Sequence, residues 1–171
     1  MAMKLVLTDD PVLRAVVAPV SKKEFKTPKL KETLEQMARV LDAEPDGVAL
    51  AAPQVGISKR IFIVRYDRMS PNHHEKREAE IGVFINPEFV RRSRRKEEMD
   101  EGCLSVRGHY GTTLRHERAT VKAYDEHGIP FERGGGGILS QAFQHEMDHL
   151  NGTLFTDHAT HLRTIEKEDH A

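Results

Sequence analysis

The feature that most constrains this chain is the hexapeptide at residues 144–149, which contains the pattern H-E-x-x-H. Residues four apart in an α-helix lie on the same face, so His145 and His149 can offer two imidazoles to one metal ion. Glu146 lies beside them, where its carboxylate can take a proton from a water molecule on that ion. The pattern predicts a helix over residues 138–150 that carries a catalytic metal site, and such a site needs a third ligand.

Three sources of a third ligand can be compared. A metzincin would have a histidine at position 155, but Phe155 has no metal-binding atom, which excludes that class. A thermolysin-like peptidase would take a downstream carboxylate, for which Glu166 and Glu168 are the candidates. Cys103 is the only cysteine in the chain, and a thiolate with two imidazoles leaves one position open for water. A lone cysteine is more commonly a buried apolar residue, but its glycine, serine and acidic neighbours favour a ligand here.

Three motifs in this order resemble those of peptide deformylases. The family pattern G-x-G-hydrophobic-A-A-x-Q corresponds to residues 47–54, E-G-C-L-S is intact at residues 101–105, and Q-H-E-x-D-H is intact at residues 144–149. The resemblance extends from about Asp10 to about Asp157. The second and third motifs together are highly specific for the family.

Two residues depart from the family pattern. Ala49 stands where the family usually has its second glycine, and its methyl group is expected to crowd the substrate backbone or restrict a positive φ. Arg107 stands where proline is more usual, with an expected effect on the loop that edges the substrate cleft. Neither departure removes a metal ligand.

The resemblance implies a metal-dependent hydrolase that removes the formyl group from N-formylmethionine at the start of newly synthesised polypeptides, releasing formate. It implies that Cys103, His145 and His149 bind the metal, and that Glu146 moves the water proton. The metal would be Fe²⁺, with Zn²⁺ or Ni²⁺ as alternatives, because thiolate and imidazole suit all three ions.

The resemblance also assigns the remaining site residues. The side-chain amide of Gln54 and the backbone N–H of Leu104 would stabilise the charge that develops on the formyl oxygen. The substrate pocket would be lined by Val48, Ala49, Tyr110, Gln141 and Ala142. An unbranched methionine side chain suits such an irregular apolar space.

Length and composition agree with a small enzyme. The 171 residues are expected to form a single catalytic domain, residues 1–171. The net charge of -1 gives no general attraction to DNA or to an anionic membrane, and no apolar run approaches the roughly 20 residues that span a bilayer. A single cysteine suits a reducing compartment, which predicts a cytoplasmic protein. The expected partners are N-formylmethionyl nascent peptides, with transient ribosome contact.

The fold class implied by the resemblance is α+β, with antiparallel β-sheet packed around the helix that carries the H-E-x-x-H motif. Thr27 and Pro28 form a helix start, and the helix is expected to stop near residues 45–47. Strand patterns occur at residues 61–64, 83–85 and 120–124. Residues 70–80, with His73 and His74, are expected to form a solvated loop.

Several features leave alternatives open. The basic run at residues 91–96 is expected to be a solvated strand or hairpin, with RNA contact as a minor alternative. The four glycines at residues 134–137 are expected to be either a mobile edge of the cleft or a loop. Gln144 and Asp148 either orient the helix and the ligands or lie on a solvated face, whereas Leu139, Phe143 and Leu150 are expected in the core.

Two alternative functions remain at this point. The same metal centre could serve a peptidase that cuts internal amide bonds, although the sequence shows no support for its longer cleft or different third ligand. The chain could also be a relative that has lost catalysis and acts as a metal-binding or ribosome-associated module. The presence of both Glu146 and Gln54 opposes the second alternative, because a purely structural site needs neither a base nor an oxyanion donor.

Overall fold

A computed structural model describes residues 2–70 and 78–165 of the chain. Within them, all strand pairs are antiparallel, and the strands form a five-stranded sheet of order β1-β2-β3-β6-β7 and a three-stranded sheet of order β4-β5-β8. The strand bounds are β1 (Ala49–Ala51), β2 (Ile61–Arg65), β3 (Ile81–Arg92), β4 (Lys96–Cys103), β5 (Val106–His116), β6 (Arg118–Tyr124), β7 (Pro130–Gly136) and β8 (Thr160–Thr164). This architecture confirms the expected α+β class.

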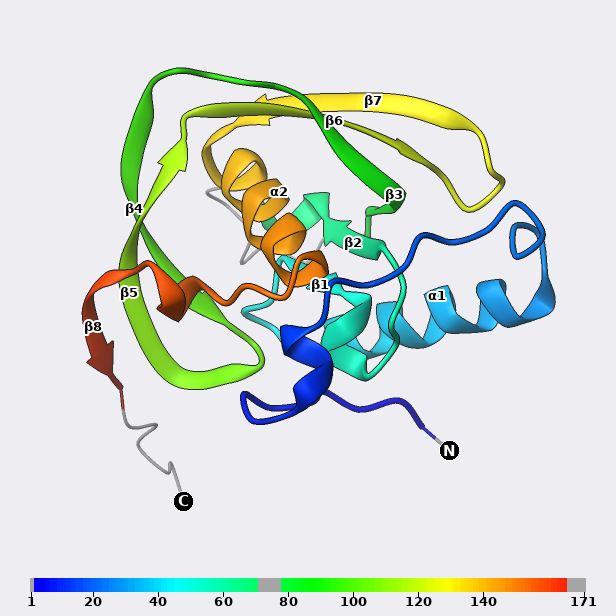
Figure 1. Cartoon of the computed structure of the whole chain (residues 1–171), viewed down its shortest axis with the longest axis horizontal. Coiled ribbons are helices and arrows are strands. Elements are labelled where there is room, and N and C mark those ends of the chain that lie inside the picture. Colours follow the sequence, from blue (N-terminus) through cyan, green and yellow to red (C-terminus); the bar gives the residue numbers. More distant parts are fainter. Residues whose placement is uncertain (1, 71–77, 166–171) are drawn as a thin grey trace.

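Helix α2 (Gly137–Leu150) lies at the centre of the molecule, with strands of both sheets around it (Figure 1). The ring of Phe143 packs against those of Phe62 and Phe84, with centroids 6.1 and 5.3 Å apart. Phe143 and Leu150 are fully buried and Leu139 is partly buried against the same cluster, as expected. Full burial of a side chain such as Phe143 or Leu150 contributes about 1.5–3 kcal/mol, so this packing holds the helix that carries the motif in the core.

Helix α1 (Pro28–Asp42) begins as the sequence predicts. The hydroxyl of Thr27 accepts a hydrogen bond from the backbone N–H of Leu30 at 3.2 Å, which satisfies a free donor at the helix start. The helix ends before the predicted stop near residues 45–47. The guanidinium of Arg68 donates to three backbone carbonyls in and after the last turn, those of Leu41, Glu44 and Gly47, and so stabilises the early end.

Strand β3 is much longer than the predicted residues 83–85. The polar residue Asn86 interrupts the apolar pattern, and its φ of 53° coincides with an irregularity in the pairing with β6. Its side chain accepts a hydrogen bond from the N–H of Val20 and donates to the carbonyl of Val20. These bonds compensate for the interruption, and the strand continues to Arg92 before β4 begins at Lys96. The prediction of a solvated strand or hairpin for the basic run is confirmed.

The glycine run was expected to be a loop or a mobile edge of the cleft, and the loop expectation is wrong. Gly134, Gly135 and Gly136 lie in β7 and pair with β6. A Cβ atom at Gly134 would lie 2.6 Å from the hydroxyl oxygen of Thr120, and one at Gly135 would lie 2.8 Å from the side chain of Leu139. The glycines allow β7 to lie close to β6 and to α2.

Some expectations fall partly or wholly outside the described residues. Most of the predicted loop at residues 70–80, including His73 and His74, lies there, as do the candidate ligands Glu166 and Glu168. Among the residues that the structure describes, no helix has the length and hydropathy needed to cross a membrane.

Candidate metal centre

Three potential metal ligands converge from two elements. Cys103 ends β4, and His145 and His149 lie one turn apart on α2. The Nε2 atom of His149 lies 3.3 Å from the Cys103 sulfur and 3.2 Å from the Nε2 atom of His145. Ligand atoms of all three residues lie within 4.8 Å of one another, and this is the only such group in the described part of the chain. One thiolate and two imidazoles that face a common point fit a divalent transition metal.

The orientation of the first histidine is fixed by a buried acidic residue. Glu101 is 5 % exposed, and its Oε2 atom lies 2.9 Å from Nδ1 of His145, which leaves the Nε2 atom free for a metal. Burial opposes ionisation of Glu101, but hydrogen bonds from His145 and Arg115 outweigh it and hold the pKa of the carboxyl well below its usual range. The carboxylate therefore stays charged and acts as a fixed hydrogen-bond acceptor.

A buried arginine holds that carboxylate. Arg115 on β5 donates from Nε to Glu101 at 3.0 Å and from one terminal nitrogen to the second oxygen of Glu101. Its other terminal nitrogen donates to Asp148 on α2 at 2.8 Å. The chain of contacts therefore runs from β5 through Glu101 to His145, one of the three potential metal ligands. Asp148 helps to orient the helix, as one of the two sequence alternatives proposed.

Gln144 has the same kind of role in fixing the helix. Its side-chain oxygen accepts from the N–H of His116 at 2.8 Å, and its amide nitrogen donates to the carbonyl of His116 at 3.0 Å and to that of Ser140 at 3.0 Å. The side chain is 6 % exposed. The solvated-face alternative for Gln144 is therefore wrong, and this residue joins α2 to the last residue of β5.

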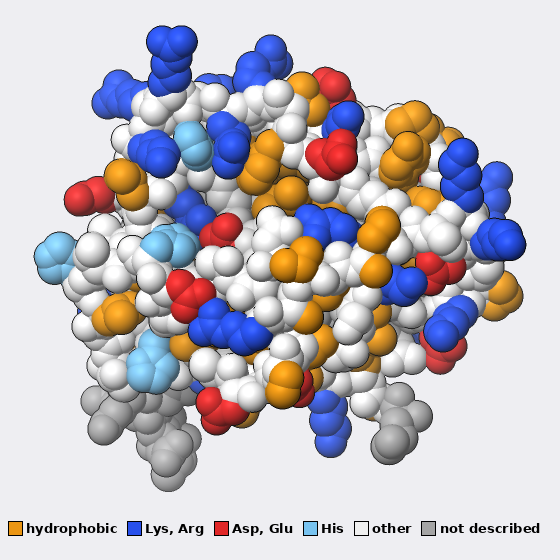
Figure 2. All heavy atoms as spheres, in the orientation of Figure 1, with side chains coloured by type: hydrophobic (Ala, Val, Ile, Leu, Met, Phe, Trp, Pro, Cys, Tyr) orange, Lys and Arg blue, Asp and Glu red, His pale blue; other side chains and the backbone are white. Residues whose placement is uncertain are grey.

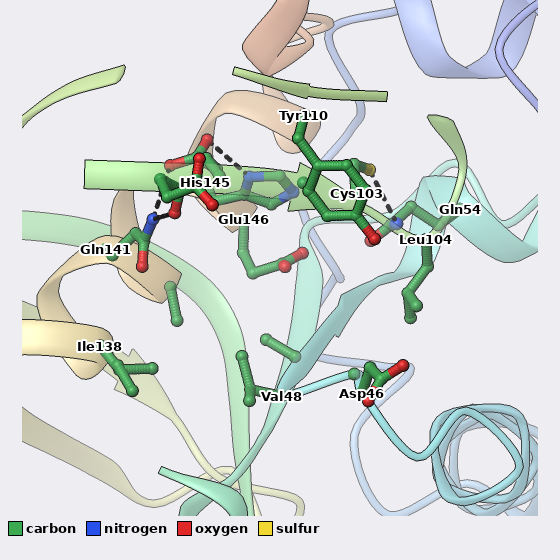
Figure 3. A pocket seen from close by; sticks show the side chains of 16 residues that line it. Asp46, Val48, Gln54, Cys103, Leu104, Tyr110, Ile138, Gln141, His145 and Glu146 are labelled. Carbon is green, nitrogen blue, oxygen red and sulfur yellow. Dashed lines mark hydrogen bonds and ion pairs between the residues drawn. The ribbon is translucent and has the colours of Figure 1, made fainter. Parts of the chain in front are cut away.

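Glu146 occupies the floor of a cavity beside the ligands. Its carboxylate points into the cavity (Figure 3), the residue is 3 % exposed, and Oε2 has no hydrogen-bond partner among the described residues. Burial raises the pKa of Glu146 to about 7. An unpartnered buried carboxylate costs free energy unless another molecule completes its hydrogen bonds, so its position indicates a functional role.

Gln54 approaches the ligands from the opposite side. It lies in a short 3₁₀ helix (Ala52–Val55), where its Oε1 atom accepts from the N–H of Ala51 at 2.9 Å. This bond directs the amide nitrogen toward the site, 3.3 Å from the hydroxyl of Ser105 and 3.6 Å from the sulfur of Cys103. Two N–H donors are thus held beside the ligand group.

The cavity has a volume of about 320 Å³, and all five residues expected to contact substrate line it. They are Val48, Ala49, Tyr110, Gln141 and Ala142, and the cavity is also lined by Leu104, the second expected oxyanion residue. Figure 3 shows Tyr110 and Leu104 on one side of the cavity and Gln141 and Ile138 on the other. The amide of Gln141 donates to the backbone carbonyl of Asp100 at 2.8 Å, so its polar end is already engaged.

Of the two residues that depart from the family pattern, Ala49 lines the cavity and Arg107 does not. Ala49 pairs with Val64 in β1 and does not have a positive φ, so the expected backbone restriction is wrong, whereas its methyl group does face the cavity. Arg107 lies outside the residues that line the cavity and pairs with Glu44 at 2.9 Å. Its expected effect on the edge of the cleft therefore has no support in the structure.

Glu101 and Arg115 are residues of the candidate site that the sequence analysis did not assign. Glu101 could have been found, because it lies inside the E-G-C-L-S motif. Arg115 has no local signal in the sequence, since it stands between Leu114 and His116 at the end of a strand with a mixed polar pattern.

Position 155, where a metzincin would have its third histidine, is occupied by a core residue. Phe155 is buried, and its ring packs against His145 with a centroid distance of 6.3 Å.

Comparison with known proteins identifies the family. The sequence model described as polypeptide deformylase matches residues 2–164. The chain belongs to the peptide deformylase family. Curated relatives include the peptide deformylases of Pseudomonas aeruginosa, 38% identical over 90% of this chain and 84% of the relative, and of Carboxydothermus hydrogenoformans, 39% identical over 93% and 94%.

Solved deformylase structures share the fold. A Met-Ala-Ser-bound class I type b peptide deformylase from Acinetobacter baumannii superposes with a TM-score of 0.82 at 34% identity, covering 92% of this chain and 98% of that one. The Thermotoga maritima peptide deformylase gives a TM-score of 0.80 at 34% identity, covering 94% and 99%. This deformylase is therefore a metal-dependent hydrolase that removes the N-formyl group from nascent polypeptides. The peptidase and non-catalytic alternatives are set aside.

Replacing Arg115 by methionine should destabilise the deformylase by about 3–5 kcal/mol, because the buried Glu101 carboxylate loses its guanidinium partner. Metal affinity should also fall by about 10–100-fold, since Glu101 orients His145. Denaturant unfolding and metal titration measure these two effects.

The exposed Arg14–Asp157 pair provides a matched control. Replacing Arg14 by methionine should cost about 1 kcal/mol or less and leave metal affinity unchanged. Equal losses in the two variants would show that the buried network has no special role.

Proposed function

We propose that residues 1–171 form one catalytic domain in which Cys103, His145 and His149 hold the metal ion of the deformylase. The convergence of their three donor atoms beside the unpartnered carboxylate of Glu146 carries this proposal. The fit is supported by the contact between Glu101 and Nδ1 of His145, which leaves Nε2 available. When bound, the metal would act as a Lewis acid and make a water molecule more acidic.

Glu146 is proposed as the general base and acid. Its carboxylate faces the cavity and accepts a proton from the attacking water, then delivers that proton to the methionine nitrogen as the formyl C–N bond breaks. The products are formate and a free amino terminus. Because Glu146 does not belong to the ligand group, it keeps both oxygens for proton transfer.

Gln54 and Leu104 are proposed to stabilise the charge on the formyl oxygen. The Gln54 amide is held by Ala51 with its N–H groups toward Cys103, and the N–H of Leu104 belongs to the peptide bond that follows Cys103. Donors fixed in this way need no rearrangement when charge develops, and removing one such donor typically costs about 10²–10³-fold in turnover.

The cavity is proposed to take the methionine side chain of the substrate. Val48, Ala49 and Ala142 supply apolar wall, and Gln141 contributes its stem because its amide is engaged with the backbone of Asp100. Tyr110 stands at the entrance, 37% exposed. The binding of Met-Ala-Ser by the similar Acinetobacter baumannii enzyme supports a pocket for a peptide that begins with methionine.

Iron is the proposed physiological metal, with zinc or nickel as alternatives that the same donors accept. The proposed location is the cytoplasm, where a metal-binding thiolate stays reduced, and the proposed encounter with substrate includes transient contact with the ribosome. Protein loaded anaerobically with Fe²⁺ should release one formate per formyl-Met peptide consumed. Absence of formate with iron, zinc and nickel alike would refute the assigned site.

Changing Ala49 to glycine tests the pocket wall. Its methyl group faces the cavity, so its removal should change KM or peptide preference modestly while metal content stays the same. If the alanine only stiffens β1, kinetics will be unchanged and stability will fall by roughly 0.4–1 kcal/mol. Measurements of kcat, KM and melting temperature separate the two results, and the second would exclude a substrate contact.

A further inference from the structure

The cavity is bordered on one side by a short segment that joins helix α1 to strand β1. We call residues 46–48 the rim segment, because Asp46, Gly47 and Val48 all line the cavity. Figure 3 shows Asp46 and Val48 at the lower edge of the cavity, below Leu104. The segment leads into β1, which lies at the edge of the five-stranded sheet and has β2 as its neighbour. Strand pairing therefore supports this side of the cavity from one direction.

A largely enclosed arginine lies beside the rim segment. Arg68 ends a short 3₁₀ helix (Tyr66–Arg68) that follows β2. Lys and Arg side chains project into solvent on the face drawn in Figure 2, whereas the side chain of Arg68 is 13% exposed. Enclosing a guanidinium group costs free energy unless its N–H donors find acceptors, so the bonds that it makes indicate its role.

The guanidinium group of Arg68 joins the rim segment to the end of α1. One terminal nitrogen donates to the carbonyl of Gly47 in the rim segment at 2.8 Å. The same nitrogen donates to the carbonyls of Leu41 and Glu44 at 3.0 and 2.7 Å. The other terminal nitrogen donates to the carbonyl of Asp42 at 3.2 Å. One planar group with several donors thus fixes the last turn of α1 and the rim segment relative to each other.

The rim segment has little space in which to shift toward its neighbours. A Cβ atom at Gly47 would lie 2.9 Å from the side chain of Leu41 and 3.0 Å from that of Leu104. The only direction that packing leaves open is away from these side chains, and the bond from Arg68 to the Gly47 carbonyl opposes that movement. Loss of this bond would therefore change the shape of the cavity wall.

We propose that Arg68 is a positioning residue that holds the rim segment in the conformation that accepts substrate. The inference rests on the proposed function of the cavity as the pocket for the first side chain of the substrate. Without the guanidinium group, the rim segment would become ordered only on substrate binding, and the free energy of ordering would be lost from the affinity. The chemical step would change little, because Glu146 and the candidate ligands lie on α2 and at the end of β4.

The test measures kcat and KM of the metal-loaded enzyme with a short formyl-Met peptide. Arg68→Met should raise KM by about three- to tenfold, the usual penalty for ordering flexible groups on binding. The value of kcat should change by less than about twofold, and metal content should stay the same. Arg68→Lys should recover part of the loss, because an ammonium group can still donate to several carbonyls. If Arg68→Met does not fold, Arg68→Gln provides the same measurement with the same expected rise in KM.

Arg60→Met is the matched control, because Arg60 also donates to a backbone carbonyl at the end of a helix. Its guanidinium group lies 3.0 Å from the carbonyl oxygen of Leu150 in α2, and the residue does not line the substrate cavity. This variant should lose stability in denaturant unfolding without a rise in KM. The proposal is overturned if Arg68→Met and Arg68→Gln leave KM unchanged, or if Arg60→Met raises KM equally.

Val48→Ala separates failure of this inference from failure of the proposed pocket. The substitution alters the cavity wall directly, so it should raise KM whatever holds the rim segment in place. A rise in KM for Val48→Ala but not for Arg68→Met would refute the positioning role and leave the pocket standing. Unchanged KM in both variants would refute the pocket, and the positioning role with it.

Discussion

Changing Glu146 to glutamine should reduce turnover of a formyl-Met peptide by at least about 10²–10⁴-fold, the usual contribution of a general acid–base group. Glutamine has nearly the same shape as glutamate but cannot accept the water proton. Metal content should remain stoichiometric, because Glu146 lies outside the ligand group formed by Cys103, His145 and His149. Steady-state kinetics and elemental analysis of the same sample separate chemistry from assembly.

An exposed acid on β4 serves as the control for this substitution. Glu98 lies outside the cavity, so Glu98→Gln should retain full activity. Near-normal deformylation by metal-loaded Glu146→Gln would show that another group moves the proton. In that case the unpartnered carboxylate at the cavity floor would need a different explanation.

Removing the Cys103 thiolate should reduce deformylase activity as strongly as Glu146→Gln does, but through loss of the metal. Cys103→Ala leaves only His145 and His149, and two imidazoles hold a divalent ion far less well than three ligands. Purified Cys103→Ala should contain little metal after dialysis and should lose deformylase activity in proportion. Elemental analysis and formate release measure the two losses.

Ser105→Ala is the matched control on the same turn. The Ser105 hydroxyl accepts a hydrogen bond from Gln54 and is not part of the ligand group, so this variant should keep its metal. Full metal occupancy in Cys103→Ala would contradict the assigned ligand set. The third metal ligand would then be sought among the carboxylates beyond position 165.

Features of the fold that depend on local sequence were predictable. Thr27 starts α1 because a hydroxyl at that position satisfies a nearby N–H, and this requires no knowledge of the rest of the chain. The spacing of His145 and His149 likewise guarantees a shared helix face. A thiolate ligand could also be proposed, because the chain has a single cysteine and glycine, serine and acidic residues lie near it.

Features that depend on distant pairing were not predictable. Arg115 belongs to the buried network because Gly111, Thr113 and Arg115 share the inward face of β5, and β4–β5 pairing places Glu101 opposite Gly111. That register cannot be read from either strand alone. The glycines of β7 were misinterpreted for the same reason, since their function depends on Thr120 and Leu139, which approach from β6 and α2.

The three potential metal ligands come from two different layers of the fold. Cys103 belongs to the three-stranded sheet, whereas His145 and His149 lie on a helix that packs into the core of the five-stranded sheet. A metal ion bound by all three residues would cross-link these two layers, because neither layer could move away from the other without breaking a bond between the metal and a ligand. Binding of this kind adds to the free energy of unfolding. Metal supply would then govern the lifetime of the folded enzyme as well as its activity.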